Sequence, residues 1–157
     1  MRLPVEGALP VSPRSSPMRT EIPPANEAPA MTAEHMRRLI VAAYEAYETG
    51  DRAAIEAAIG PDFSFTSPYD DAIDRQTYFE RCWPVHETTA SMHVERIVIE
   101  GDAAFVTYVL TNTSGQTFRN TEFLTFRGGR IASVDVYFGP EYRNGLLSPA
   151  QPPDTKH

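Results

Sequence analysis

Residues 117–138 read TFRNTEFLTFRGGRIASVDVYF, and this stretch decides the fold of the chain. Two runs of alternating apolar and polar residues flank the glycines at 128–129, which is typical of a β-hairpin. The turn allows two registers. A two-residue turn pairs Phe126 with Ile131, whereas a three-residue turn with a bulge at the second glycine pairs Phe126 with Arg130.

The bulged register is the one we expect, because it separates apolar from polar residues most cleanly. It places Glu122 opposite Val134, with Asn120 as the other polar residue of an otherwise apolar inner face. The apolar members of that face are Phe118, Leu124, Phe126, Ala132, Val134, Val136 and Phe138. Glu122 is then a lone carboxyl group on an apolar surface, where desolvation raises its pKa.

Upstream of the hairpin, the pattern predicts helices, one strand and then more strands. Thr32 is a good N-cap for a helix that runs to Thr49 and ends at Gly50. The other expected elements are a short helix capped by Asp51 and ended by Gly60-Pro61, a strand at 63–66, a loop at 67–71, a helix over 75–83 capped by Asp74 and ended by Pro84, and strands at 92–100 and 103–113. This order predicts an α+β fold in which helices cover one face of a curved antiparallel sheet.

The two ends of the chain differ in composition from the middle. Residues 1–30 hold seven of the fourteen prolines and show no helical or strand period, so we expect a disordered extension. Translation from Met18 or Met31 is an alternative explanation. Residues 144–157 are also proline-rich, and we expect a disordered tail there. The folded domain is then residues 31–143, which is an ordinary size for one domain.

The charge and cysteine content argue against several classes of partner. The chain carries 14 Lys and Arg against 21 Asp and Glu, and an acidic surface repels phosphate, so we expect neither nucleic acid nor membrane as a partner. The single Cys82 excludes an internal disulfide and is typical of a cytoplasmic protein. The longest apolar run, Leu39–Tyr44, is far shorter than the ~20 residues that a membrane span needs.

Three strings of residues occur in an order and spacing that carry a family resemblance. They are Tyr47-Glu-Thr-Gly-Asp51 after the first helix, Phe65-Thr-Ser-Pro68 at the end of a strand, and Glu122-Phe-Leu-Thr-Phe126 continuing to Val136-Tyr-Phe-Gly139 in the hairpin. Together they resemble the nuclear-transport-factor-2-like, or SnoaL-like, superfamily over residues 31–143. The resemblance implies a cystatin-like roll, in which a strongly curved mixed or antiparallel sheet wraps around a long helix and forms a cone-shaped pocket.

The resemblance also implies a homodimer that pairs through the outer face of the sheet. In the bulged register this face carries Phe123, Ile131 and Tyr137 among polar residues. The partners we expect are therefore a second copy of the chain and a small apolar molecule in the pocket.

Ketosteroid isomerases, polyketide cyclases, epoxide hydrolases and dehydratases belong to this superfamily, and their functional residues match this chain only in part. The hydrogen-bonding acid of the isomerases corresponds to Glu122. Their general base corresponds to Ser67, and their catalytic tyrosine corresponds to Ala43, from which Tyr44 points about 100° away. The acid on the last strand of the cyclases and epoxide hydrolases corresponds to Val136. The resemblance therefore does not imply steroid isomerisation by the usual constellation.

Two acidic residues are the candidates for catalysis. Glu122 is the first, and its alternative role is a structural acid bonded to an Arg or a Tyr. Asp70 lies with Asp71 at the expected pocket mouth, and the alternative there is a solvated loop pair. The residues expected to bind a ligand are Tyr47, Tyr69, Asn120, Val134, Val136 and Phe138. Tyr44 and Tyr108 could also place hydroxyl groups in the cavity, although tyrosines more often bury the ring and bond the hydroxyl to backbone.

We expect no metal and no cofactor. His86 and His93 do not form a metal-ligand spacing with each other or with Glu87. The sequence has no phosphate-binding glycine loop, because the glycines at 128–129 belong to the hairpin. Cys82 has no nucleophile motif around it.

Two functional hypotheses follow from these residues. The first is a cofactor-independent isomerase, lyase or hydrolase that uses Glu122 as acid or base on a small hydrophobic carbonyl or hydroxyl compound. The second is a non-catalytic module that binds an apolar ligand or serves as a dimerisation scaffold. The missing base at Ser67 favours the second hypothesis, and the acid kept at Glu122 favours the first. A deep, closed pocket with a second titratable group within a few ångströms of Glu122 would support catalysis, whereas a filled cone would support a scaffold.

Overall fold

A computed structural model describes residues 31–143 and 146–147 of the chain. The expected extension at 1–30 and nearly all of the expected tail at 144–157 lie outside the described residues. Within them, the elements follow the order expected from the sequence, with one early and two late strands added. No helix in the described part of the chain is long and apolar enough to cross a membrane.

The first two helices begin at the predicted caps. The helix α1 (Ala33–Thr49) starts where the Thr32 hydroxyl accepts a hydrogen bond from the backbone N–H of His35 at 3.2 Å, and it ends at Gly50 with φ of 69°. A left-handed φ favours glycine, so this C-cap confirms the prediction. The helix α2 (Arg52–Ala58) is capped by Asp51. It ends before Gly60, which lies within the next strand, so the predicted end was slightly late.

The third helix is shorter than predicted. The helix α3 (Arg75–Arg81) is capped by Asp74, as expected, but it does not reach Trp83. A 3₁₀ helix (Trp83–Thr88) follows it, with Pro84 in its first turn. Proline lacks an N–H and disfavours α conformation in the residue before it, so the chain leaves the α-helix two residues early and continues in a tighter turn.

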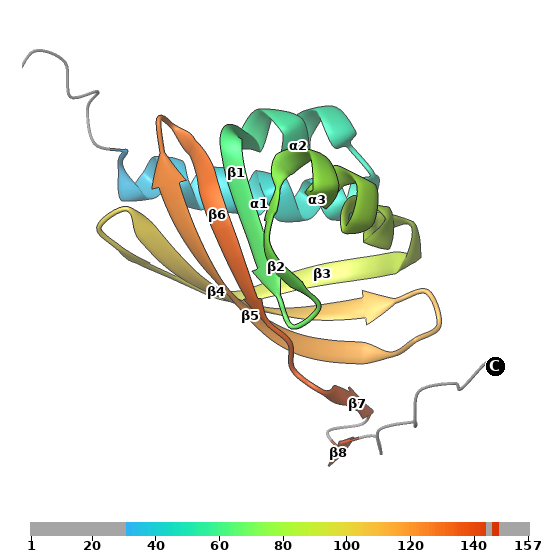
Figure 1. The fold of residues 1–157 in the computed structure, drawn as a ribbon. Helices are drawn as coiled ribbons and strands as arrows, with labels where there is room; N and C mark the ends of the chain where they lie inside the picture. Colours follow the sequence, from blue (N-terminus) through green and yellow to red (C-terminus); the bar gives the residue numbers. More distant parts are fainter. Residues whose placement is uncertain (1–30, 144–145, 148–157) are drawn as a thin grey trace, which may run out of the picture.

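The strands are β1 (Ile59–Ser67), β2 (Asp70–Asp74), β3 (Thr89–Glu100), β4 (Ala103–Asn112), β5 (Thr117–Arg127), β6 (Arg130–Tyr137), β7 (Glu141–Arg143) and β8 (Leu146–Leu147). They form one mixed sheet in the order β2-β1-β6-β5-β4-β3 (Figure 1), and the two short strands join it where β7 pairs with β5 and β8 with β7. The strand β1 pairs in parallel with β6, and the other pairings are antiparallel. The parallel pairing brings the first strand beside the last strand of the predicted hairpin.

The strand β2 begins inside the loop that the sequence predicted at 67–71 and leaves only a turn at 68–69. It turns back from Ser67 and pairs with β1 at the edge of the sheet. Its acidic residues are unusual in strands and hid the strand in the sequence, yet charge is a common protection of an exposed edge.

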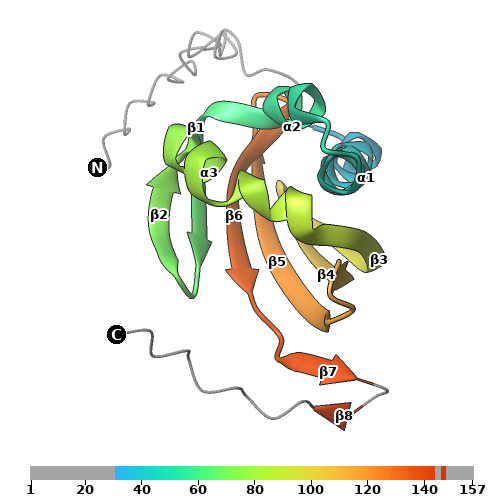
Figure 2. The ribbon, with the colours of Figure 1, turned by 90° about the vertical axis from the view of Figure 1, so that its right-hand side faces the viewer.

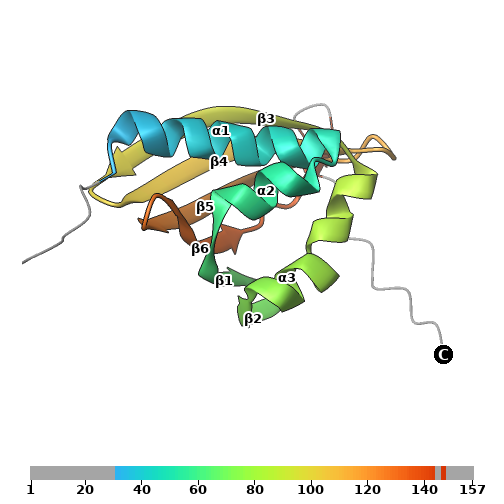
Figure 3. The same ribbon diagram turned by 90° about the horizontal axis from the view of Figure 1, so that it is seen from above.

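The helices α1, α2 and α3 lie on the same side of the sheet, as Figures 2 and 3 show from two directions. The sheet is not strongly curled, so the expected strong curvature is wrong in degree. Irregular pairings in β3 and β6 bend these strands locally instead. The core fills the space between the helices and the inner face, and its most buried large residues are Ile40, Ile59, Leu124, Ile131 and Val106.

The register of the hairpin combines both alternatives. The turn is the two-residue type, with positive φ at both glycines, and Phe126 pairs with Ile131 rather than with Arg130. A bulge follows at the next pair, because Thr125 lies opposite residue 133 and Ala132 is left extra. Beyond the bulge Glu122 lies opposite Val136, which is two residues from the expected partner.

This register has one consequence for each face. A slip of two residues preserves the inner and outer faces, so Glu122 and Leu124 point inward as expected. Before the bulge the faces are exchanged, and Ile131 is 2% exposed in the core instead of lying on the outer face. The outer face therefore has one apolar residue fewer than the dimer prediction assumed.

Candidate functional site

A cavity of about 450 Å³ opens between the helices and the inner face of the sheet. Its walls are mostly apolar and come from all three α-helices, the 3₁₀ helix and the strands β1 to β6. The two catalytic candidates and the six residues expected to bind a ligand all line this cavity: Glu122, Asp70, Tyr47, Tyr69, Asn120, Val134, Val136 and Phe138. The cone is therefore not filled, and the cavity within it is partly open to solvent rather than closed.

Glu122 lies on β5 with its carboxyl group in the cavity wall, and two tyrosines hold it. The Tyr44 hydroxyl from α1 donates to Oε2 at 2.7 Å, and the Tyr108 hydroxyl from β4 donates to Oε1 at 2.8 Å. The two rings also meet edge to face, with 4.9 Å between their centroids. Glu122 remains partly accessible because it faces the cavity.

Burial governs the protonation of this cluster. Desolvation raises the pKa of Glu122, and the hydrogen bonds from Tyr44 and Tyr108 lower it only in part. Desolvation and the nearby charge of Glu122 together raise the pKa of both tyrosines well above the ordinary value. Glu122 is therefore the group in this cluster that can gain or lose a proton most readily.

Asn120 extends the cluster toward the end of β6. Its side chain is buried, and its Oδ1 accepts a hydrogen bond from the backbone N–H of Gly139 at 2.9 Å. Its Nδ2 donates to the Tyr108 hydroxyl at 3.4 Å. A continuous series of hydrogen bonds therefore links Gly139 to Glu122.

A second pair of tyrosines lies deeper in the cavity wall. The hydroxyls of Tyr47 and Tyr78 form a short hydrogen bond, and the Tyr47 ring packs on Trp83 at 4.9 Å between centroids. Desolvation by burial raises the pKa of both hydroxyls. Tyr78 is therefore part of the core, the half-buried Tyr47 packs against it, and their hydroxyl groups satisfy each other.

Asp70 lies at the cavity rim and not beside Glu122's tyrosines. It forms an ion pair with Arg81 at 2.7 Å rather than a well-aligned hydrogen bond, and it accepts a hydrogen bond from the Ser67 hydroxyl at 3.2 Å. The Cys82 thiol lies 3.8 Å from Asp70, and burial raises the pKa of that thiol to about 11. A protonated thiol is a poor nucleophile, which agrees with the interpretation of Cys82 from the sequence.

The rim also carries two aromatic side chains. Tyr69 is 80% exposed, and its ring lies 5.7 Å from that of Phe138. Both side chains are exposed and line the cavity, so they mark a place where it meets solvent.

Sequence reasoning did not commit to Tyr44 and Tyr108, although it named both as tyrosines that could reach the cavity. Tyr44 lies four residues after Ile40 and eight after Met36, and all three are buried on one face of α1. Tyr108 alternates with the buried Val106 on β4. These spacings were the signal that would have found them.

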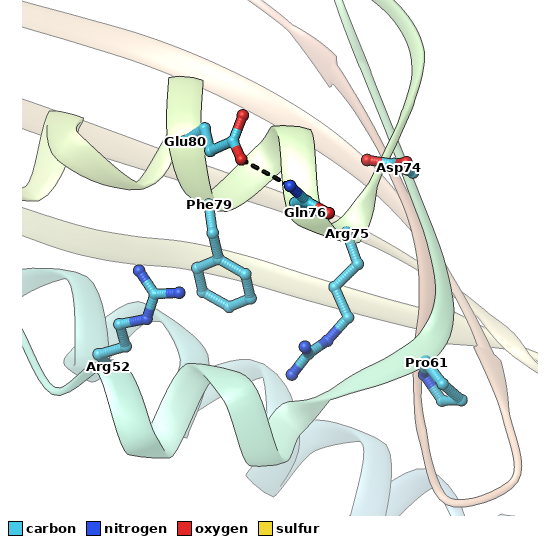
Figure 4. A pocket seen from close by; sticks show the side chains of 7 residues that line it. All are labelled: Arg52, Pro61, Asp74, Arg75, Gln76, Phe79 and Glu80. Atoms are coloured by element: carbon cyan, nitrogen blue, oxygen red, sulfur yellow. Dashed lines mark hydrogen bonds between the residues drawn. The ribbon is translucent and has the colours of Figure 1, made fainter.

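A second hollow lies on the outside, between α2 and α3 (Figure 4). Arg52 and Arg75 both approach the Phe79 ring, at 4.2 and 5.2 Å from its centroid. Arg52 also pairs with Glu56 at 2.7 Å, and Arg75 donates to the Glu56 backbone carbonyl at 3.1 Å. These contacts tie the two helices together, so we assign this hollow a structural role.

Among residues 31–143 and 146–147, no group of three His, Cys, Asp or Glu side chains lies close enough to hold a metal ion.

Comparisons with known proteins agree on fold and family. The structure of an NTF2-like protein of unknown function from Cytophaga hutchinsonii is 22% identical in sequence to this chain, with a TM-score of 0.56. The match covers 66% of this chain and 89% of that protein. A cystatin-like protein of unknown function from Methylobium petroleophilum is 18% identical, with a TM-score of 0.64 and coverage of 75% and 84%. A provisionally named ketosteroid isomerase from Kribbella flavida is 16% identical, with a TM-score of 0.59 and coverage of 76% and 93%.

These identities support the fold alone, and no curated protein matches the chain. The SnoaL-like domain family matches residues 40–134, which is more than half of the sequence and includes every element from most of α1 to β6. The chain therefore belongs to the SnoaL-like family and has the NTF2-like fold.

Proposed function

We propose that this chain binds a small, largely apolar molecule in the cavity and that Glu122 exchanges a proton with the polar group of that molecule. One observation carries the proposal: a carboxyl group with a raised pKa lies in an apolar cavity wall, held by Tyr44 and Tyr108. In the described part of the chain, no Arg or Lys forms an ion pair with it. Strongly perturbed groups in a cleft are typical of functional sites.

The reaction class that suits this arrangement is cofactor-independent isomerisation, elimination or hydrolysis. A neutral Glu122 would donate a hydrogen bond to a carbonyl or hydroxyl oxygen of the ligand, and an ionised Glu122 would take a proton from it. Asp70 is the candidate for a second base at the rim, because its side chain lines the same cavity. Its ion pair with Arg81 and the hydrogen bond from the Ser67 hydroxyl hold the carboxyl group in this position.

The alternative is a non-catalytic ligand-binding or dimerisation scaffold, and an observation on the outer face favours pairing. Phe105 is 49% exposed, and its ring lies 4.8 Å from that of Phe123 on the neighbouring strand. Val98 and Tyr137 are also exposed. Exposed apolar side chains gathered on a sheet face commonly mark an interface, so we propose a homodimer through this face.

The single Cys82 supports a cytoplasmic location, where thiols stay reduced.

A panel of small cyclic ketones and alcohols tests the binding proposal, with Glu122 carbon-13 labelled for NMR. We expect compounds that bind to shift the Glu122 carboxyl resonance and to move its pKa. Glu122→Leu should abolish that binding, whereas the exposed Glu87→Gln should leave it unchanged. Mass spectrometry of the native protein would add the identity of any copurified ligand. A panel that perturbs only residues outside the cavity would contradict the proposal.

A further inference from the structure

The hydrogen bonds from Gly139 to Glu122 have a fixed direction. A backbone N–H can only donate, so the oxygen bonded to Gly139 N must be Asn120 Oδ1. The other end of the amide is then the NH₂ group, which can only donate, and it lies against the Tyr108 hydroxyl oxygen. Tyr108 accepts there, and its own proton is directed to Glu122 Oε1 at 2.8 Å.

Gly139 holds the first link of this series through its close approach to β5. A Cβ added at position 139 would lie 1.8 Å from the backbone oxygen of Arg119. Only glycine allows the chain to pass at this distance, and this passage aims the Gly139 N–H at Asn120. The orientation of the Asn120 amide is therefore fixed by backbone.

Glu122 Oε1 thus accepts a hydrogen bond whatever the charge of the carboxyl group. We infer that Asn120 is a positioning residue that, through Tyr108, confines the exchangeable proton of Glu122 to Oε2, beside the Tyr44 hydroxyl. The inference deepens the proposed function, because it names the side of the carboxyl group on which a ligand would meet the proton.

The two states of Glu122 differ at Tyr44. When Glu122 is ionised, the Tyr44 hydroxyl donates to Oε2 at 2.7 Å. When Glu122 is neutral, Oε2–H donates to the Tyr44 oxygen, and the Tyr44 proton turns toward the cavity. A ligand oxygen beside Oε2 then either accepts from the Tyr44 hydroxyl or takes the place of Tyr44 and accepts from Oε2–H directly. The titratable groups that face Glu122 are Tyr44 on α1, Tyr108 on β4, and Tyr47 and Tyr78, whose pKa values the charge of Glu122 also raises.

The substitution Asn120→Asp tests the inference without any ligand. The new carboxylate can still accept from Gly139, so a purely structural role is retained, but it cannot donate to Tyr108. The Tyr108 proton should then turn to it and leave Glu122 Oε1. We expect the pKa of Glu122, followed by carboxyl carbon-13 NMR, to rise above that of the unaltered chain.

The added charge alone would also raise this pKa, and Tyr108→Phe supplies the control. In the Tyr108→Phe background, Asn120→Asp should raise the pKa of Glu122 by clearly less than it does alone, because no hydroxyl remains to turn. Equal rises in both backgrounds, or no rise at all, would overturn the inference.

A measurement on the unaltered chain keeps the inference testable if these variants fail to fold. As Glu122 titrates, the Tyr44 hydroxyl changes from acceptor to donor toward Oε2, whereas Tyr108 donates throughout. The ring Cζ resonance of Tyr44 should therefore shift more than that of Tyr108, and the reverse order would contradict the assignment. Because neither measurement needs a ligand, failure of the binding panel and failure of this inference are separate results.

Discussion

The substitution Glu122→Gln should make the folded chain more stable at neutral pH, with a defined dependence on pH. The amide is neutral and nearly the same size, and it can reproduce the neutral state of Glu122. Its oxygen can accept from Tyr108, and its NH₂ group can donate to the Tyr44 oxygen. The substitution therefore removes the cost of ionising a desolvated carboxyl group while keeping both hydrogen-bond positions filled.

The sign and size of the effect follow from proton linkage. Burial raises the pKa of Glu122 in the folded chain, so between its ordinary value of about 4.5 and the raised value the folded state holds a proton that the unfolded state has released. The stability contributed by this proton is fully present below the ordinary pKa and is lost as pH rises through the raised one. One proton corresponds to a slope of at most about 1.4 kcal/mol per pH unit in the unfolding free energy.

Urea denaturation at a series of pH values measures this slope. The unfolding free energy of the unaltered chain minus that of Glu122→Gln should fall as pH increases above about 4.5 and then become constant. Subtraction removes the contributions of other titrating groups, and the exposed Glu87→Gln is a control that should give a flat difference. A difference that stays flat for Glu122→Gln, or that increases with pH, would refute the reasoning, because it would mean that the fold favours the ionised carboxylate.

Three other outcomes test different parts of the structure. Trp83→Ala should lower the unfolding free energy by about 3–5 kcal/mol, because the buried indole packs on Tyr47 and stacks on His86; a loss below about 1 kcal/mol in urea denaturation would contradict this packing. Gly139→Ala should cost about 1–3 kcal/mol by forcing the segment after β6 away from Arg119, and an unchanged thermal midpoint would be inconsistent with the close approach. Phe105→Glu should convert the proposed homodimer to monomer in light scattering, whereas a monomeric mass for the unaltered chain at micromolar concentration would exclude the dimer.

Local signals in the sequence predicted the elements whose ends depend on a few neighbouring residues. Thr32, Asp51 and Asp74 each cap the helix that they were expected to cap, because an N-cap depends on one side chain and the three backbone positions after it. The strand β2 was missed for the opposite reason. Its pairing with β1 lies at an edge, where no apolar face is needed and the usual alternation is absent.

The hairpin shows which part of a register prediction is robust. The glycines at 128–129 form the tighter turn, and the required change of face is made by the bulge at Ala132 instead. Burial of one apolar face constrains only whether a residue points in or out, and several combinations of turn and bulge satisfy it. Glu122 was therefore placed on the correct face although its partner was wrong, and Ile131, on the turn side of the bulge, was placed on the wrong one.

The neighbours of Glu122 depend on contacts that the sequence does not encode locally. Tyr44 is far from Glu122 along the chain, and it reaches the carboxyl group only because this face of α1 packs on the sheet. The family resemblance placed the tyrosine position at Ala43, which lies on the cavity wall but has no hydroxyl group. Tyr44 follows Ile40 and Met36 on the buried face of α1, so its hydroxyl faces the sheet and reaches the carboxyl group that Ala43 cannot bond. The chemistry of this cavity therefore follows from which hydroxyl groups reach Glu122, and the contacts show these to be Tyr44 and Tyr108.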